Sequence, residues 1–273
     1  VNRRRILSLW LPRLPIDRIK RKLAQDIASQ AETREVDEPP ASEVSTSAGL
    51  SPPLRGRVGE RGSHEHRPSG SPLSLALPRK GGGNPSADAS LTNAMSNDLP
   101  SVVVAKDHNA ILLHAVDEAA MRAGLSIGLP LANARAICPE LTVYDADPAA
   151  DLKMLNDIAD WCDRFTPLVA LDPPYGLFLD ITGCAHLFGG ERALLQIVTH
   201  ALSRRGFAVS AAIAGTSIAA RTLTRHISGK IVASGEEAQA VGPLPVSALG
   251  ADPAVTTGLR RAGLKTIGDV AAR

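Results

Sequence analysis

Aromatic residues and cysteines are scarce in this sequence. Of its 273 residues, only 3% are Phe, Trp or Tyr, and the three cysteines are Cys138, Cys162 and Cys184. They are widely spaced and form no C-x-x-C pair, so neither a zinc site nor a disulfide framework is indicated, and a reducing cytoplasm fits best. No run reaches the roughly 20 apolar residues that a membrane-spanning helix needs. Pro12 and Pro15 break the apolar run near the N-terminus, so we predict no signal peptide and no membrane contact.

A large excess of one charge is missing as well. The formal net charge is only +2, which does not by itself indicate a nucleic-acid partner. Residues 1–22 nevertheless carry eight basic residues against one acid, Asp17. Such a cluster could steer a polyanion, although a solvated helix face would have the same composition. The basic residues are Arg3, Arg4, Arg5, Arg13, Arg18, Lys20, Arg21 and Lys22.

Residues 36–100 contain little that could form a core. This segment is rich in Pro, Gly and Ser and has no aromatic residue, so we predict that it is a disordered insertion. Its "HEH" (His64, Glu65, His66) is not an H-E-x-x-H zinc motif, and its "RKGGGN" is not a phosphate-binding loop.

The flanking sequence has the periodicity of an α+β domain. Apolar spacing predicts helices over 16–30, 117–124, 130–138, 150–166, 190–206 and 217–227. Short apolar runs predict strands over 101–107, 110–116, 175–182, 207–214 and 230–234, the first two forming a hairpin. We expect a mixed sheet with helices on one face. Two short helices around "AGLKTIG" near the C-terminus have the pattern of a helix-hairpin-helix, whose amides and basic residues bind phosphates.

The stretch "ILSLWLPRLPID" places a buried strand close to the N-terminus. Ile6, Leu7 and Leu9 are apolar, and chemistry is often found where such a strand ends. Here the end consists of Trp10, Leu11 and Pro12, without a carboxylate, histidine or nucleophile.

In their order along the chain, these pieces resemble a Y-family translesion DNA polymerase. "CPEL", "FLDIT" and "LPVSALG…GLKTIGDVA" carry the resemblance, and "LSLWLPRLPIDR" and "GLFLDITGCAHLFGGE" are most similar to the ImuB-type branch, a catalytically inactive mutasome subunit. The resemblance implies a palm strand (1–12), fingers (13–145, interrupted by 36–100), the remaining palm (146–235) and a truncated helix-hairpin-helix thumb (236–273). The little-finger domain is expected to be absent.

Active members of that family hold two Mg²⁺ ions with carboxylates, because hard cations require oxygen ligands. The resemblance places the ligand positions on Trp10 and Pro12 after the first strand, and on Tyr175 and Gly176 before the strand at Leu179–Asp180. None of these side chains supplies a carboxylate. Asp172 and Asp180 are the residual acids nearby. We therefore expect an emptied site, with no metal and no cofactor; Mg²⁺ would be needed only if the chain were active.

The positions that would hold a nucleotide are changed too. A motif like Y-x-A-R falls on Asp117 and Ala120, or on Glu118 and Met121. A triphosphate-binding Lys falls on Ser217, with Arg221 one turn later. The residue that excludes ribonucleotides falls on Leu14 or Pro15. We expect Asp180 to be structural, Cys184 and His186 to pack, and Trp10 to fill the vacated pocket, with base stacking as the alternative.

The resemblance implies a DNA-binding scaffold in damage-induced mutagenesis and translesion synthesis. Candidate DNA contacts are Arg260, Arg261 and Lys265 in the hairpin, with Arg3, Arg4 and Arg5. The implied partners are primer–template DNA, bound weakly, a second polymerase, an accessory mutasome protein and the sliding clamp, whose usual docking regions would lie beyond Arg273. Two alternatives stay open: an active error-prone polymerase, and a simple DNA-binding module or non-functional fragment.

Overall fold

The computed structural model describes residues 4–37 and 99–273, so the predicted disorder of 36–100 falls almost entirely outside the described residues. The strands are β1 (Ile6–Trp10), β2 (Ser101–Asp107), β3 (Ala110–Val116), β4 (Thr142–Asp145), β5 (Val169–Asp172), β6 (Gly176–Asp180), β7 (Ser210–Ala214) and β8 (Lys230–Ile231). The α-helices are α1 (Leu14–Asp37), α3 (Glu118–Arg122), α4 (Leu131–Ile137), α5 (Pro148–Cys162), α6 (Glu191–Arg204), α7 (Ser217–His226), α8 (Glu237–Val241), α9 (Pro253–Arg261) and α10 (Ile267–Ala271), with 3₁₀ turns η1 (Ala185–Phe188) and η2 (Val246–Leu249). No helix in this described part is long and apolar enough to cross a membrane.

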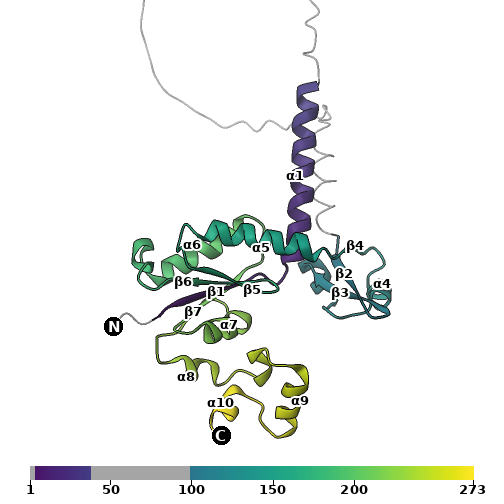
Figure 1. Ribbon diagram of the computed structural model, residues 1–273. Coiled ribbons are helices and arrows are strands. Elements are labelled where there is room, and N and C mark those ends of the chain that lie inside the picture. Colours follow the sequence, from purple (N-terminus) through teal and green to yellow (C-terminus); the bar gives the residue numbers. More distant parts are fainter. Residues whose placement is uncertain (1–3, 38–98) are drawn as a thin grey trace, which may run out of the picture.

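The first strand becomes the middle of a five-stranded sheet. The strand order is β5-β6-β1-β7-β8, so β1 has a partner on each side (Figure 1). It runs antiparallel to β6 and β7, whereas β8 is parallel to β7. The sheet is mixed, as predicted. Its register puts Trp10, at the end of β1, opposite both Gly176 and Ser210.

Both faces of this sheet are covered by helices. Leu7 and Leu9 pack on one face against a core that includes Leu194 of α6, and Leu155 of α5 lies in the same cluster. Ile6 points to the other face, in a cluster with the small and apolar side chains of α7. The α+β fold class is confirmed. The prediction that helices cover only one face of the sheet is wrong. A strand buried on both sides needs apolar partners above and below it, and α7 covers the second face.

A second, three-stranded sheet has the order β3-β2-β4. The predicted hairpin forms its antiparallel pair, and β4, which we had not predicted, adds to β2 in parallel. His108 in the hairpin turn has a φ of 52°, in the left-handed region that non-glycine residues seldom adopt. A separate apolar cluster unites this sheet with α3 and α4.

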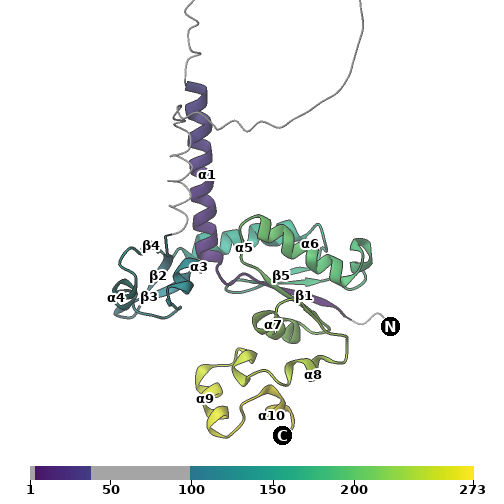
Figure 2. The same ribbon diagram turned by 180° about the vertical axis from the view of Figure 1, so that it is seen from behind.

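Helix α1 connects the two sheets and is longer than the predicted helix over 16–30. Near its start, Ile16 is buried against Val103 and Ala115 of the three-stranded sheet. Farther along, Leu23 and Ile27 are 42% and 48% exposed, because the helix projects beyond the body of the protein (Figures 1 and 2).

The C-terminal helices α8, α9 and α10 lie below α7 in Figure 1. The turn between α9 and α10 contains Gly263 with a φ of 85°, which glycine adopts without steric cost. A capping box of Thr266 and Asp269 then starts α10. The expected pair of short helices around "AGLKTIG" is therefore present.

Candidate functional site

The end of β1 is the centre of the candidate site. Trp10 is directly opposite Gly176 in the β1–β6 ladder, and the Leu11 amide donates to the carbonyl of Tyr175 over 2.9 Å. Pro12 follows in the turn before α1. The fold thus brings Trp10, Tyr175 and Gly176 together, and none of these side chains can offer a carboxylate to a cation.

A buried carboxylate close to this point, that of Asp172, is held by two arginines. Asp172 is 6% exposed at the end of β5, opposite Gly176. Its Oδ2 lies 3.3 Å from Nε of Arg221 and 3.3 Å from Nη2 of Arg225, both on α7. Burial lowers the pKa of Arg225, as does neighbouring Arg221, while Asp172 acts in the opposite direction. The guanidinium groups thus supply the positive charge that this buried carboxylate requires.

Arg225 also covers Trp10. Its central carbon lies 4.3 Å from the centroid of the Trp10 ring, a cation–π contact. Trp10 is therefore packed against a cation of its own chain, and the idea that it fills a vacated pocket stays a prediction.

Gly176 has no room for a side chain. A Cβ built at this position would meet the backbone oxygen of Asp172 at 2.8 Å and its Oδ2 at 2.9 Å. The same close approach that excludes a Cβ would exclude a glutamate at this position.

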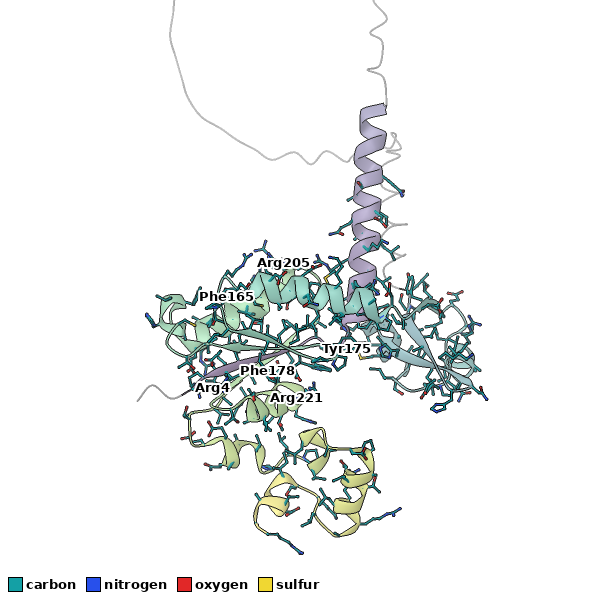
Figure 3. All side chains as sticks on the ribbon, viewed as in Figure 1. Arg4, Phe165, Tyr175, Phe178, Arg205 and Arg221 are labelled. Atoms are coloured by element: carbon teal, nitrogen blue, oxygen red, sulfur yellow. The ribbon has the colours of Figure 1, made fainter. Side chains whose placement is uncertain are left out.

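Tyr175 links the two sheets. Its hydroxyl lies 2.6 Å from Nε2 of His114 on β3, and its ring centroid is 6.1 Å from that of Trp10. Burial raises the pKa of Tyr175 to about 12, so the phenol keeps its proton at ordinary pH. Figure 3 shows Tyr175 between the five-stranded sheet and the three-stranded sheet.

Asp180 lies at the opposite end of the sheet from Trp10. It pairs with Ile6 in the ladder, and Ile6 lies four residue steps along the strand from Trp10, or about 13 Å. Its carboxylate accepts from the Thr182 amide at 3.1 Å and pairs with Arg4 at 3.0 Å. Burial would raise the pKa of Asp180, but the hydrogen bonds from Thr182 and Arg4 outweigh it and lower the pKa. These contacts agree with the structural role expected for Asp180.

The positions expected to face a nucleotide have local partners. Asp117 caps α3 by accepting from the Ala120 amide, and its other oxygen lies 2.6 Å from Nζ of Lys20. Glu118 lies 3.7 Å from Nη1 of Arg13. Met121 is exposed, Ser217 begins α7, and both Leu14 and Pro15 are buried at the start of α1.

The two groups of candidate DNA contacts differ. Arg5 makes a two-fold pair with Glu191, with both N–O distances 2.6 Å, and also donates to the Val232 carbonyl. Arg4 pairs with Asp180, and Arg3 lies outside the described residues.

In the thumb-like helices the basic residues are free of such pairs. Arg260, Arg261 and Lys265 are exposed, and none has an acidic partner within 4.0 Å among the residues that the structure describes. Arg260 and Lys265 line a pocket of about 360 Å³ together with Pro243, Pro245 and Thr266.

The remaining candidates are peripheral. Cys184 packs against the edge of the main core, where burial raises the pKa of its thiol, and His186 is exposed in η1. Across residues 4–37 and 99–273, no cluster of three or more His, Cys, Asp or Glu could hold a metal ion.

Two residues at the site escaped the sequence interpretation. Arg225 and His114 were not considered, although both touch residues that were. The four-residue spacing of Arg221 and Arg225 on a predicted helix places both on one face, and this spacing is the signal that could have found Arg225.

Comparisons with known proteins identify the family. The impB/mucB/samB family model matches residues 86–225. Protein ImuB of Caulobacter vibrioides is 45% identical over 150 residues, which is 55% of this chain and 33% of that protein. DNA polymerase IV 2 of Mesorhizobium japonicum is 30% identical over 154 residues, 54% of this chain and 37% of the polymerase. This chain thus matches about a third of the length of these curated relatives.

Solved polymerase structures show the same fold. DinB from Sulfolobus solfataricus superposes with a TM-score of 0.53 at 16% identity, over 68% of this chain and 57% of that one. An insertion ternary complex of Dbh DNA polymerase gives a TM-score of 0.54 at 14% identity, over 69% and 57%. With half of its length matched by the family model and a polymerase-like sheet around β1, the chain belongs to the impB/mucB/samB family and has the Y-family DNA polymerase fold.

Proposed function

We propose that this chain is a catalytically inactive Y-family polymerase homologue that binds DNA as a scaffold in damage-induced mutagenesis. In this proposal, β1 and residues 146–235 form the palm, 13–145 contain the fingers, and 236–273 form the thumb. The proposal needs no metal and no cofactor. A role on chromosomal DNA, within an SOS-type damage response, is consistent with a cytoplasmic location.

One observation carries the loss of catalysis. Asp172, the buried carboxylate in register with Gly176, is neutralised by Arg221 and Arg225. A two-metal site needs several oxygen ligands and tolerates no cation in their place, because the metal ions themselves stabilise the developing charge. Guanidinium groups at this point would repel Mg²⁺ instead of binding it.

An active error-prone polymerase is the first alternative. It would need Asp172 and Asp180 to share a metal ion, with oxygen–metal distances of about 2.0–2.1 Å. The register argues against this arrangement, since Asp180 lies beside Ile6 and Asp172 is on the Trp10 side of the sheet.

DNA binding is assigned to the thumb. Arg260, Arg261 and Lys265 are exposed cations near the hairpin there, and backbone amides of a helix-hairpin-helix add donors for phosphate oxygens. Because Arg5 is held by Glu191, we do not extend the proposed DNA contact to it. A simple DNA-binding module would use the same thumb residues without any partner protein.

The partners remain part of the proposal. The name ImuB of the 45% identical relative supports a mutasome role, in which a second polymerase, an accessory protein and the sliding clamp would be recruited. The present chain matches only a third of that relative, so these contacts are proposed for the whole protein of this type.

Primer extension with parallel DNA-binding measurements tests the proposal. Lesion-free and damaged templates would be offered with Mg²⁺ or Mn²⁺, while fluorescence anisotropy follows primer–template binding. We expect binding without extension. Extension above that of an Asp172→Asn/Asp180→Asn variant would show an active polymerase and overturn the proposal.

The same binding assay tests the thumb. Arg260→Gln/Arg261→Gln should weaken binding and reduce the slope of log K against log salt by about 0.9 for each lost phosphate contact. Arg122→Gln/Arg135→Gln removes the same charge from exposed positions on α3 and α4 and serves as the matched control. Equal loss in both variants would contradict a specific thumb contact.

A further inference from the structure

Three arginines gather around two aromatic rings on the α5–α6 side of the five-stranded sheet. The central carbons of Arg164 and Arg205 lie 4.9 Å and 4.8 Å from the centroid of the Trp161 ring. The central carbon of Arg21 lies 4.7 Å from the centroid of Phe207. We call these five residues the Trp161 arginine cluster. Rings beneath guanidinium groups hold them in defined positions.

Backbone carbonyls fix the same arginines further. Nε of Arg164 donates to the carbonyl of Trp161 at 2.8 Å, and Nη1 of Arg205 donates to that of Ala201 at 3.0 Å. Arg21 donates to the carbonyl of Arg205. These carbonyls lie at or just beyond the C-terminal ends of α5 and α6, where the helix dipole attracts cations. Such capping uses one N–H of each guanidinium and, among the residues that the structure describes, leaves most of each donor fork without an acceptor.

The cluster has positive charge without a matching acid. None of its arginines lies within 4.0 Å of an Asp or Glu carboxylate in the described ranges, whereas Arg5, Arg18 and Arg225 all do. Two of its donors, Nε of Arg21 and Nε1 of Trp161, are buried without an acceptor among the described residues. Ordered, unpaired guanidinium groups form a surface prepared for an anion.

The position of the cluster separates it from the proposed DNA contact. Figure 3 shows Arg205 on the helix layer and Arg221 on the other side of the sheet, toward the thumb-like helices. DNA held by Arg260 and Lys265 would therefore face the opposite side of the palm. Single-stranded nucleic acid also favours open aromatic rings for base stacking, but Trp161 already carries two guanidinium groups.

We propose that the Trp161 arginine cluster is a docking surface for an acidic segment of a partner protein, rich in Asp and Glu. Carboxylates match the planar guanidinium fork in two-fold hydrogen bonds and need no stacking surface. The proposal rests on the scaffold function and names the chemistry of one partner contact.

Binding of three probes, each measured in separate samples, tests this assignment. Fluorescence anisotropy would follow a labelled oligoglutamate peptide, and, in separate samples, a labelled oligothymidylate and the primer–template. Arg164→Gln/Arg205→Gln should weaken peptide binding about tenfold, because the variant loses charge-assisted hydrogen bonds to the peptide. A tenfold loss of affinity corresponds to about 1.4 kcal/mol of binding free energy. Arg122→Gln/Arg135→Gln, with the same change in charge, should leave it unchanged.

A second variant distinguishes loss of the docking contact from loss of the fold. Arg164→Lys/Arg205→Lys keeps the charge but loses the planar fork, so peptide affinity should fall to an intermediate value. Equal peptide affinity in the Gln variant and its control, or tighter binding of oligothymidylate than of peptide at the cluster, would overturn the proposal. If the wild-type chain binds the peptide but not the primer–template, the DNA-binding part of the proposed function is overturned instead.

Discussion

The guanidinium of Arg225 stacks on the indole of Trp10, although the two residues lie far apart in the sequence. The 4.3 Å contact closes a chain of interactions from Asp172 through Arg225 to Trp10 and on to Tyr175. Through the Tyr175–His114 contact, this chain extends into the three-stranded sheet. Packing and ion pairing among these side chains thus hold the end of β1, and the energetics of these contacts can be tested directly.

Asp172→Asn should destabilise the fold by about 1–3 kcal/mol, because it leaves two arginines without their buried partner. Chemical denaturation gives the free energy of unfolding. Asp157→Asn breaks an exposed pair with Lys153 and should cost less than about 0.5 kcal/mol. Because Arg221 and Arg225 already neutralise Asp172, addition of Mg²⁺ should leave the Tm of the wild-type chain unchanged. A Mg²⁺-dependent rise in Tm that Asp172→Asn abolishes would contradict this account.

Gly176→Ala should be destabilising by about 1–3 kcal/mol, because the added Cβ overlaps Asp172 and forces backbone or side-chain shifts. Gly258→Ala is the matched control, since a Cβ there meets nothing within 4 Å and lies inside α9. That control should stabilise the chain by about 0.5–1 kcal/mol through the helix preference of alanine. Thermal unfolding compares the two, and equal effects would argue against the close approach at Gly176.

Tyr175→Phe removes the hydroxyl that contacts His114 and should cost about 0.5–1.5 kcal/mol. Ultraviolet titration provides an independent readout. In the wild-type chain one tyrosine should ionise near pH 12, because burial raises the pKa of Tyr175 to about 12. The variant should lack this late step. If the late step persists in Tyr175→Phe, the raised pKa belongs to another group.

Asp180→Asn should alter the pH dependence of stability at acid pH. The pKa of Asp180 in the folded chain lies below its usual value of 3.8, so the ionised carboxylate stabilises the fold. That stabilisation is present above the unfolded-state pKa and is lost as pH falls through the lower folded-state pKa. Denaturation measured from neutral pH down to acid should therefore show a steeper decline for the wild-type chain than for the variant. Parallel curves would mean that Arg4 and Thr182 do not hold the carboxylate as the structure indicates.

Local pattern predicted the elements that pack along their whole length. The alternation of Leu7 and Leu9 identified β1, and the hairpin from 101 to 116 formed as expected. Helix α1 shows the limit of periodicity. Ile16, Leu23 and Ile27 share one apolar pattern, yet Ile16 is buried while Leu23 and Ile27 are exposed, since the helix leaves the body of the protein. The short strands β4 and β5 were missed, because four residues give too little alternation to distinguish a strand from a loop.

Only part of the candidate site could be predicted from the sequence. The absence of carboxylates at Trp10, Pro12, Tyr175 and Gly176 follows from the residue types once their alignment is assumed. The pairing of Asp172 with the arginines could not be predicted from the residue types. Asp172, Arg225 and Trp10 lie far apart in the chain, and no local period relates them. Their contact depends on the sheet order, which sets β5 and β1 on either side of β6 and places α7 across them.

The central position of β1 also sets the order in which the chain can fold. Trp10 must meet Gly176 and Ser210, which follow it by more than half of the sequence, so β1 is synthesised first but cannot complete its pairing until β6 and β7 have been made. Folds with such distant pairings form slowly, because the loop between the strands loses conformational entropy before the strand contacts can compensate for that loss. The segment 36–100 lengthens that loop less than twofold and so adds less than about 0.6 kcal/mol to its closure. A long segment between β1 and its partner strands therefore has little further effect. The rate of folding depends mainly on the large sequence separation that already exists between β1 and those strands.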